Sequence, residues 1–110
     1  MRIIGVDPGT RVTGWGIIDA EGTRFRRVSS GTISPKGEDL ATRLVGIADQ
    51  LDAIVAEYEP EAGAVESLFH AKNSQSALKL GHARGAAMVA CVVNELEVFE
   101  YAARQIKQSV

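Results

Sequence analysis

The sequence predicts an α/β fold: a mixed five-stranded sheet whose first three strands are antiparallel, with helices flanking it. Two observations favour this class. Apolar residues follow strand-like patterns over residues 1–33, and long helical patterns then alternate with short apolar runs. The resulting order is three strands, a helix, a strand, a helix and a strand. With 110 residues and 45% apolar content, the chain has enough material for one hydrophobic core, and we expect a single domain over residues 1–110.

The first part of the chain predicts an antiparallel meander. Residues 2–7 form a short apolar run that a Pro-Gly pair stops, as expected of a buried strand that ends in a turn. Residues 13–19 predict a second strand and residues 20–22 a hairpin loop. Residues 23–33 predict a third strand, which a Ser-Pro pair closes.

A helix is predicted between Asp39, which can serve as its N-cap, and Pro60, which ends it. Eight apolar residues between them share one face at helical spacing. They are Leu40, Leu44, Ile47, Ala48, Leu51, Ile54, Val55 and Tyr58.

The second part predicts a parallel addition to the sheet. Residues 62–66 form a short buried strand entered from a helix, so it should run parallel to its neighbour. A loop over residues 67–73 leads to a helix that ends near residue 94, and residues 97–101 predict the last strand.

The second helix carries small residues at four-residue spacing, Ala77, Gly81 and Gly85. Because glycine destabilises a helix, its presence suggests that another backbone packs closely there. That backbone belongs either to the sheet of the same subunit or to a partner helix.

Composition excludes several classes of protein. No apolar run is long enough to span a membrane, and the start of the chain does not resemble a signal peptide. The one cysteine, Cys91, lies in an apolar run and is expected to be a buried thiol. We therefore expect a cytoplasmic protein.

The net charge of −2 does not exclude a nucleic-acid partner, because the charge is unevenly distributed. Seven of the 14 acids lie between Asp39 and Glu66, where Arg43 is the one base. The other segments have eleven bases and seven acids. The acidity therefore belongs mainly to one helix, whose charged face is expected to be solvated.

Asp7 and Glu66 each end a predicted strand. If these strands are parallel neighbours, they lie about 4.8 Å apart. The two carboxylates can then ligate one metal ion or lie on either side of a pair of ions. Magnesium takes hard oxygen ligands, and two such ions can activate water and stabilise the leaving oxygen of a phosphodiester. Alternatively, Asp7 is a turn acid that accepts hydrogen bonds from the following backbone N–H groups.

Four segments together resemble the RuvC family, the bacterial crossover-junction endodeoxyribonucleases with an RNase H-like fold. They are residues 5–16 (GVDPGTRVTGWG), 66–73 (ESLFHAKN), 76–85 (SALKLG followed by ARG at 83–85) and 99–107 (FEYAARQIK). The resemblance runs along the whole chain in order. Four separate motifs make it specific, whereas the aspartate motif alone would be weak.

The resemblance implies a homodimer that binds four-way Holliday junctions and cuts two strands symmetrically during DNA recombination and repair. It implies catalysis with Mg²⁺, or Mn²⁺ in its place, as two ions per site held by four acidic or histidine side chains. Asp7 matches the first of these ligands and Glu66 the second. The branch-migration helicase complex of RuvA and RuvB type is implied as a partner.

The resemblance also implies DNA-binding residues. Phe69 matches an aromatic that stacks on junction bases, although by itself it would more often be a core residue. Lys72 and Asn73 lie in the same loop, near a helix N-terminus suited to phosphate. Lys107 matches a basic residue near the active site that could offset charge on the scissile phosphate; the alternative is a solvated lysine.

In the family, the third and fourth metal ligands lie on a C-terminal helix beyond the position matched by Val110. We therefore expect a chain that is truncated at its C-terminus and has weak cleavage activity or none.

Two other functions fit parts of the sequence. A Gly-x-Asp-x-Gly-Thr pattern also opens the phosphate-binding strand of sugar kinases and other actin-like ATPases, so the chain could be an ATP-binding lobe. It could also be a non-catalytic fragment that binds junctions without cutting them. Stabilisation by Mg-ATP, or by junction DNA without any cleaved product, would distinguish these alternatives.

Overall fold

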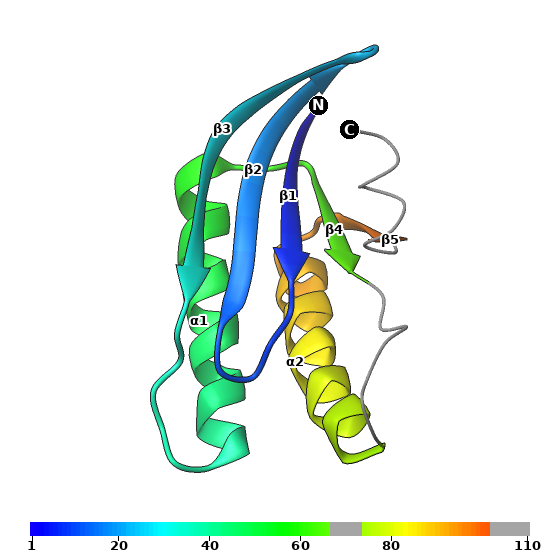
Figure 1. Ribbon diagram of the computed structural model, residues 1–110. Helices are drawn as coiled ribbons and strands as arrows, with labels where there is room; N and C mark the ends of the chain where they lie inside the picture. The colour runs from blue at the N-terminus through cyan, green and yellow to red at the C-terminus, as the bar shows by residue number, and fades with distance from the viewer. Residues whose placement is uncertain (67–73, 102–110) are drawn as a thin grey trace.

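The computed structural model describes residues 1–66 and 74–101, with the side chains of residues 74–77 and 101 left aside. Five strands form one sheet with the order β3-β2-β1-β4-β5, and two helices pack against it (Figure 1). The strands are β1 (Arg2–Asp7), β2 (Thr13–Glu21), β3 (Arg24–Ile33), β4 (Ala62–Glu66) and β5 (Glu97–Tyr101). The helices are α1 (Leu40–Tyr58) and α2 (Ser74–Val93).

The predicted mixed sheet is confirmed. β1 pairs antiparallel with β2, and β2 pairs antiparallel with β3. On its other edge β1 pairs in parallel with β4, which in turn pairs in parallel with β5. β1 therefore lies at the centre of the sheet, between the meander and the parallel strands.

The hairpin between β2 and β3 differs from the prediction. Residues 20–22 do not form its loop, because Ala20 pairs with Phe25 and Glu21 with Arg24. The turn is only two residues long, and Gly22 in its first position has a φ of 60°, as the tight type II′ turn requires. Backbone hydrogen bonds between Met1 and Ala20 extend the pairing with the start of the chain.

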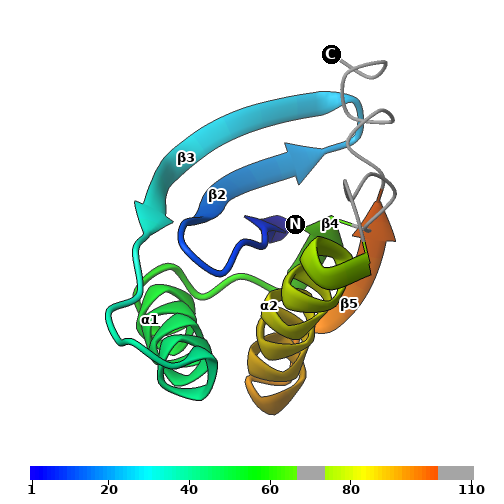
Figure 2. The same cartoon turned by 60° about the horizontal axis from the view of Figure 1, so that its bottom comes forward.

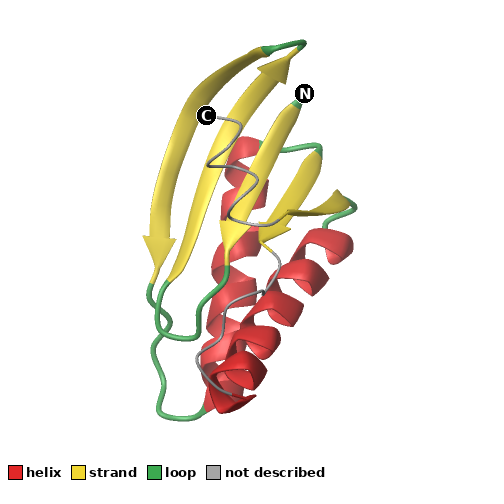
Figure 3. Ribbon diagram, turned by 45° about the vertical axis from the view of Figure 1, so that its right-hand side comes forward, coloured by secondary structure: helices red, strands yellow, loops and turns green. Residues whose placement is uncertain are grey.

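Both helices cover the same face of the sheet (Figures 2 and 3). α1 buries Ile47, Leu51 and Val55, which recur every four residues and so share one face. They meet a core from the central strands and α2 that includes Ile4, Val6, Ile17, Val65, Ala83, Ala87 and Cys91. Asp39 holds the N-cap position as predicted, but its side chain makes no capping hydrogen bond.

Helix α2 packs against the sheet through small residues. Ala83, Ala87, Ala90 and Cys91 are buried, and burial raises the pKa of the Cys91 thiol, which confirms the prediction for this residue. A Cβ atom on Gly63 of β4 would lie 2.8 Å from Cys91 Sγ, so only glycine allows this close approach.

Gly81 and Gly85 have a different environment. A Cβ atom on either residue would meet no atom of the described chain within 4 Å. Within the described part of the chain, the sheet of the same subunit therefore does not explain these two glycines. The alternative of a partner helix stays a prediction.

We predict that Gly63→Ala lowers the free energy of unfolding by about 1–3 kcal/mol, because the added methyl group overpacks the contact with Cys91. Urea denaturation measures the change. In a Cys91→Ala background the same substitution should cost clearly less, since Sγ is absent. An equal cost in both backgrounds would contradict the proposed steric contact.

Candidate metal site

Asp7 and Glu66 lie next to each other at one edge of the sheet. Asp7 is the last residue of β1 and Glu66 the last residue of β4, and both strands point the same way (Figure 1). Val6 pairs with Val65 in the parallel register, so the two acids occupy the next position along it. Neighbouring strands lie about 4.8 Å apart. The predicted adjacency of the two carboxylates is thus present in the fold.

The two acids also share one face of the sheet. Val6 and Val65 are fully buried beneath the helices. Because side chains alternate between faces along a strand, the residue after each of them points to the face opposite α1 and α2. Asp7 is exposed there and Glu66 is half-buried.

This donor set fits a divalent cation with hard-ligand preference. Carboxylate oxygens are what Mg²⁺ takes from proteins, often one or two of them, with water and substrate phosphate completing the octahedron. Within residues 1–66 and 78–100, no third acid, histidine or cysteine joins the pair to form a larger cluster. The site as described is a two-carboxylate site.

The backbone behind Asp7 is held by a residue that the sequence analysis did not single out. Thr13 is fully buried at the start of β2. Its hydroxyl accepts a hydrogen bond from the Gly9 N–H at 3.2 Å and donates one to the Gly9 carbonyl oxygen at 2.7 Å. The signal in the sequence was a polar residue at the start of a buried strand, since a buried hydroxyl requires a partner.

The four predicted DNA-binding residues lie outside the described residues. Phe69, Lys72 and Asn73 belong to the segment between β4 and α2, and Lys107 follows β5. Their predicted roles stay predictions.

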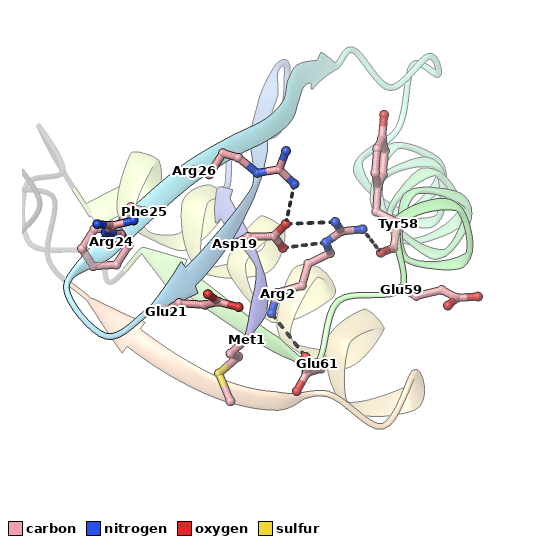
Figure 4. A pocket seen from close by; sticks show the side chains of 10 residues that line it. All are labelled: Met1, Arg2, Asp19, Glu21, Arg24, Phe25, Arg26, Tyr58, Glu59 and Glu61. Carbon is pink, nitrogen blue, oxygen red and sulfur yellow. Dashed lines mark hydrogen bonds and ion pairs between the residues drawn. The ribbon is translucent and has the colours of Figure 1, made fainter.

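A second polar feature lies at the other end of β1. This cleft of about 800 Å³ is lined by both acidic and basic side chains (Figure 4). Arg2 forms two hydrogen bonds with Asp19, at 2.8 and 3.0 Å, and donates a third to the Tyr58 carbonyl oxygen. Arg26 also pairs with Asp19.

These ion pairs determine the character of the cleft. The guanidinium groups of Arg2 and Arg26 hold the pKa of the Asp19 carboxyl well below its usual range. Asp19 is therefore already engaged with two cations of its own chain. Arg2 begins the strand that Asp7 ends, so a strand length of about 17 Å separates the two features. The cleft is distinct from the carboxylate pair.

Comparisons with known proteins show which family and which relatives this chain is similar to. A family model described as "Crossover junction endodeoxyribonuclease RuvC" matches residues 3–110. A relative of that name from Edwardsiella ictaluri is 50% identical over 108 residues, covering 98% of this chain and 62% of the relative. One from Geotalea uraniireducens is 51% identical over 111 residues, covering all of this chain and 65% of the relative. The chain thus spans a little under two thirds of the length of these relatives.

A solved structure of Thermus thermophilus RuvC in complex with a Holliday junction substrate is also similar. It superposes with a TM-score of 0.88 and 29% sequence identity, covering 98% of this chain and 67% of the other. The sheet order and this likeness confirm the predicted RNase H-like fold. By sequence and by fold, the chain belongs to the RuvC family of crossover junction endodeoxyribonucleases.

Proposed function

We propose that this protein is a structure-selective endonuclease that resolves Holliday junctions by metal-dependent hydrolysis of DNA phosphodiester bonds. The observation that carries the proposal is the carboxylate pair of Asp7 and Glu66, at the ends of two adjacent parallel strands in a chain of the RuvC family. The reaction would serve DNA recombination and repair.

Asp7 and Glu66 would hold Mg²⁺, or Mn²⁺ in its place, with two ions in a complete site. When bound, the metal supplies an activated water and stabilises the leaving oxygen. The two side chains bind and orient it from fixed strand ends. Without a cation, their negative charges would repel a phosphodiester, so DNA and metal should bind cooperatively at this edge.

The open face of the sheet gives DNA access to the acids. Gly14 and Gly16 of β2 pair with Asp7 and Gly5 of β1, so three of these four positions lack a side chain. A Cβ atom on Gly5 would meet nothing within 4 Å. Among the described residues, no side chain at these three positions would keep a DNA backbone from approaching the strand ends closely.

The predicted DNA contacts extend this proposal. Phe69 would stack on a junction base, a contact worth about 1–3 kcal/mol per base. Lys72 and Asn73 would bind phosphate, and Lys107 would offset charge on the scissile phosphate. Their support is the motif resemblance of the segments that contain them.

Helix α2 supports the proposed homodimer. The side of the helix opposite its buried residues is exposed and apolar, with His82 as its one titratable residue. We call this surface the α2 stripe; its members are Leu78, Gly81, His82, Gly85, Val89, Val92 and Val93. An exposed apolar surface of this kind often marks a protein–protein contact, and the open space at Gly81 and Gly85 would admit a partner helix closely.

Further partners and location follow from the same proposal. A branch-migration helicase complex of RuvA and RuvB type would act with the protein on the same junction. No helix among residues 1–66 and 74–101 is long and apolar enough to cross a membrane. We propose the cytoplasm, where the chromosome of a bacterium lies, as its location.

The function is tested with Asp7→Asn on synthetic four-way junction DNA. The variant should lose Mg²⁺-dependent nicking, because a metal ligand is gone, and retain junction binding in EDTA, with an affinity that falls steeply with salt. Asp49→Asn on the exposed face of α1 is the matched control and should change neither property. Anisotropy measures binding, and denaturing gels measure nicking.

The assay uses both the 110-residue chain and a chimera that adds the part of the Edwardsiella ictaluri relative beyond the aligned residues. Nicking by Asp7→Asn at the unaltered rate would refute the metal role. Junction binding with no nicking in either form would favour the non-catalytic alternative. Thermal stabilisation by Mg-ATP without junction binding would favour the ATP-binding one.

For the dimer, we predict that Val89→Asp raises the dissociation constant by more than about tenfold, because it buries an unpaired charge in the interface. Analytical ultracentrifugation measures it. Val45→Asp on α1 is the control, since Val45 is 59% exposed and Val89 61%. A dimer that tolerates Val89→Asp as well as Val45→Asp would exclude the α2 stripe as the interface.

A further inference from the structure

We propose that Thr13 is a positioning residue for the metal site: its buried hydroxyl fixes the Gly9 peptide and, through it, the backbone that carries Asp7. The inference rests on the proposed role of Asp7 as a cation ligand. Thr13 itself would touch neither metal nor DNA.

The contacts of Thr13 are directed at a single residue. Among the described residues with assigned side chains, Thr13 is the one polar residue that is buried. Its hydroxyl accepts from the N–H of Gly9 and donates to the carbonyl oxygen of Gly9, at 3.2 and 2.7 Å. Both backbone groups of Gly9 are thereby satisfied by one side chain, which fixes its peptide units on both sides.

The loop that these bonds close has little freedom of its own. Residues 8–12 join β1 to β2, and Pro8 is buried and has a restricted φ. At Gly9, any side chain would collide with the carbonyl oxygen of Val12. The backbone at Gly9 therefore lies very close to the backbone at Val12, and the hydrogen bonds of the Thr13 hydroxyl hold the two together.

The orientation of Asp7 depends on this backbone, because its side chain has little other support. Its cross-strand partner is Gly14, which has no side chain, and a Cβ atom there would lie 3.7 Å from Asp7 Cβ. No donor within the described part of the chain forms a hydrogen bond with the exposed Asp7 carboxylate. Thr13 is adjacent to Gly14 and bonds to Gly9, two residues beyond Asp7, so it ties together both strand ends that flank the acid.

If the role of Thr13 were purely structural, its hydroxyl would stabilise the hairpin without changing the affinity for the metal. Two substitutions separate the roles: Thr13→Val keeps the shape and removes the hydroxyl, and Thr13→Ser keeps the hydroxyl and removes the methyl group. Groups that orient a metal ligand typically change affinity by 10–100-fold, so we expect Mn²⁺ binding by the 110-residue chain to weaken about tenfold in Thr13→Val. Thr13→Ser should bind within about twofold of the unaltered chain, far short of that range.

Mn²⁺ affinity is measured by electron paramagnetic resonance titration of the folded chain. Leu51→Ala is the control for stability, because it removes a buried side chain of α1, outside the β1–β4 pairing and the loop, and should leave Mn²⁺ affinity unchanged. Equal affinities in Thr13→Val and the unaltered chain would overturn the inference, as would an equal loss in Thr13→Ser and Thr13→Val. Mn²⁺ binding that Asp7→Asn leaves unaffected would instead refute the proposed metal site itself.

Amide hydrogen exchange provides a readout that needs no metal. In the unaltered chain the Gly9 amide should be protected, because its N–H is bonded to a buried hydroxyl. In Thr13→Val that protection should be lost while the strand amides of β1 keep theirs. An unprotected Gly9 amide in the unaltered chain would show that the bond is not made and would overturn the inference.

Discussion

The parallel pairing of β1 with β4 is the constraint on which the rest of the structure depends. It joins two strands that are separated in sequence by a meander and a helix, and it brings Asp7 and Glu66 to the same edge. The far end of β1 secures this register. There Arg2 bonds to Asp19 of β2 and to the end of α1 at Tyr58, and its carbonyl oxygen accepts a hydrogen bond from the Glu61 N–H. The hydrogen bonds of Arg2 at the start of β1 thus help to fix the position of the proposed metal site at the end of β1.

Glycines serve opposite purposes on the two faces of this sheet. On the helix face they permit tight packing: Gly63 accommodates Cys91, and a Cβ atom on Gly31 would lie 2.9 Å from the Trp15 ring. On the other face, Gly5 and Gly14 leave space around Asp7. The helix face therefore provides a rigid support, and among the described residues the other face leaves room around Asp7.

Much of the fold could be predicted from the sequence, because apolar patterns together with turn and cap residues identified every strand and helix that the structure describes. The adjacency of Asp7 and Glu66 followed from a general property of parallel strands entered through a helix. The β2–β3 turn was misplaced because Ala20 and Glu21 have weak strand propensity, yet their pairing with β3 and Met1 extends the strand. The outward direction of Gly81 depends on how α2 is rotated against the sheet, which periodicity does not fix in a helix with small or apolar residues on several sides. The burial of Thr13 was likewise decided by tertiary packing.

Asp7 and Glu66 are proposed to share a bound divalent cation. Anomalous diffraction from a crystal of the chain soaked in Mn²⁺ tests this shared binding most directly. We predict an anomalous difference peak within coordination distance of both carboxylates, on the face of the sheet opposite α1 and α2. A peak confined to the cleft around Glu21 and Glu61, or no peak at saturating Mn²⁺ in a crystal where the open face is accessible, would contradict it.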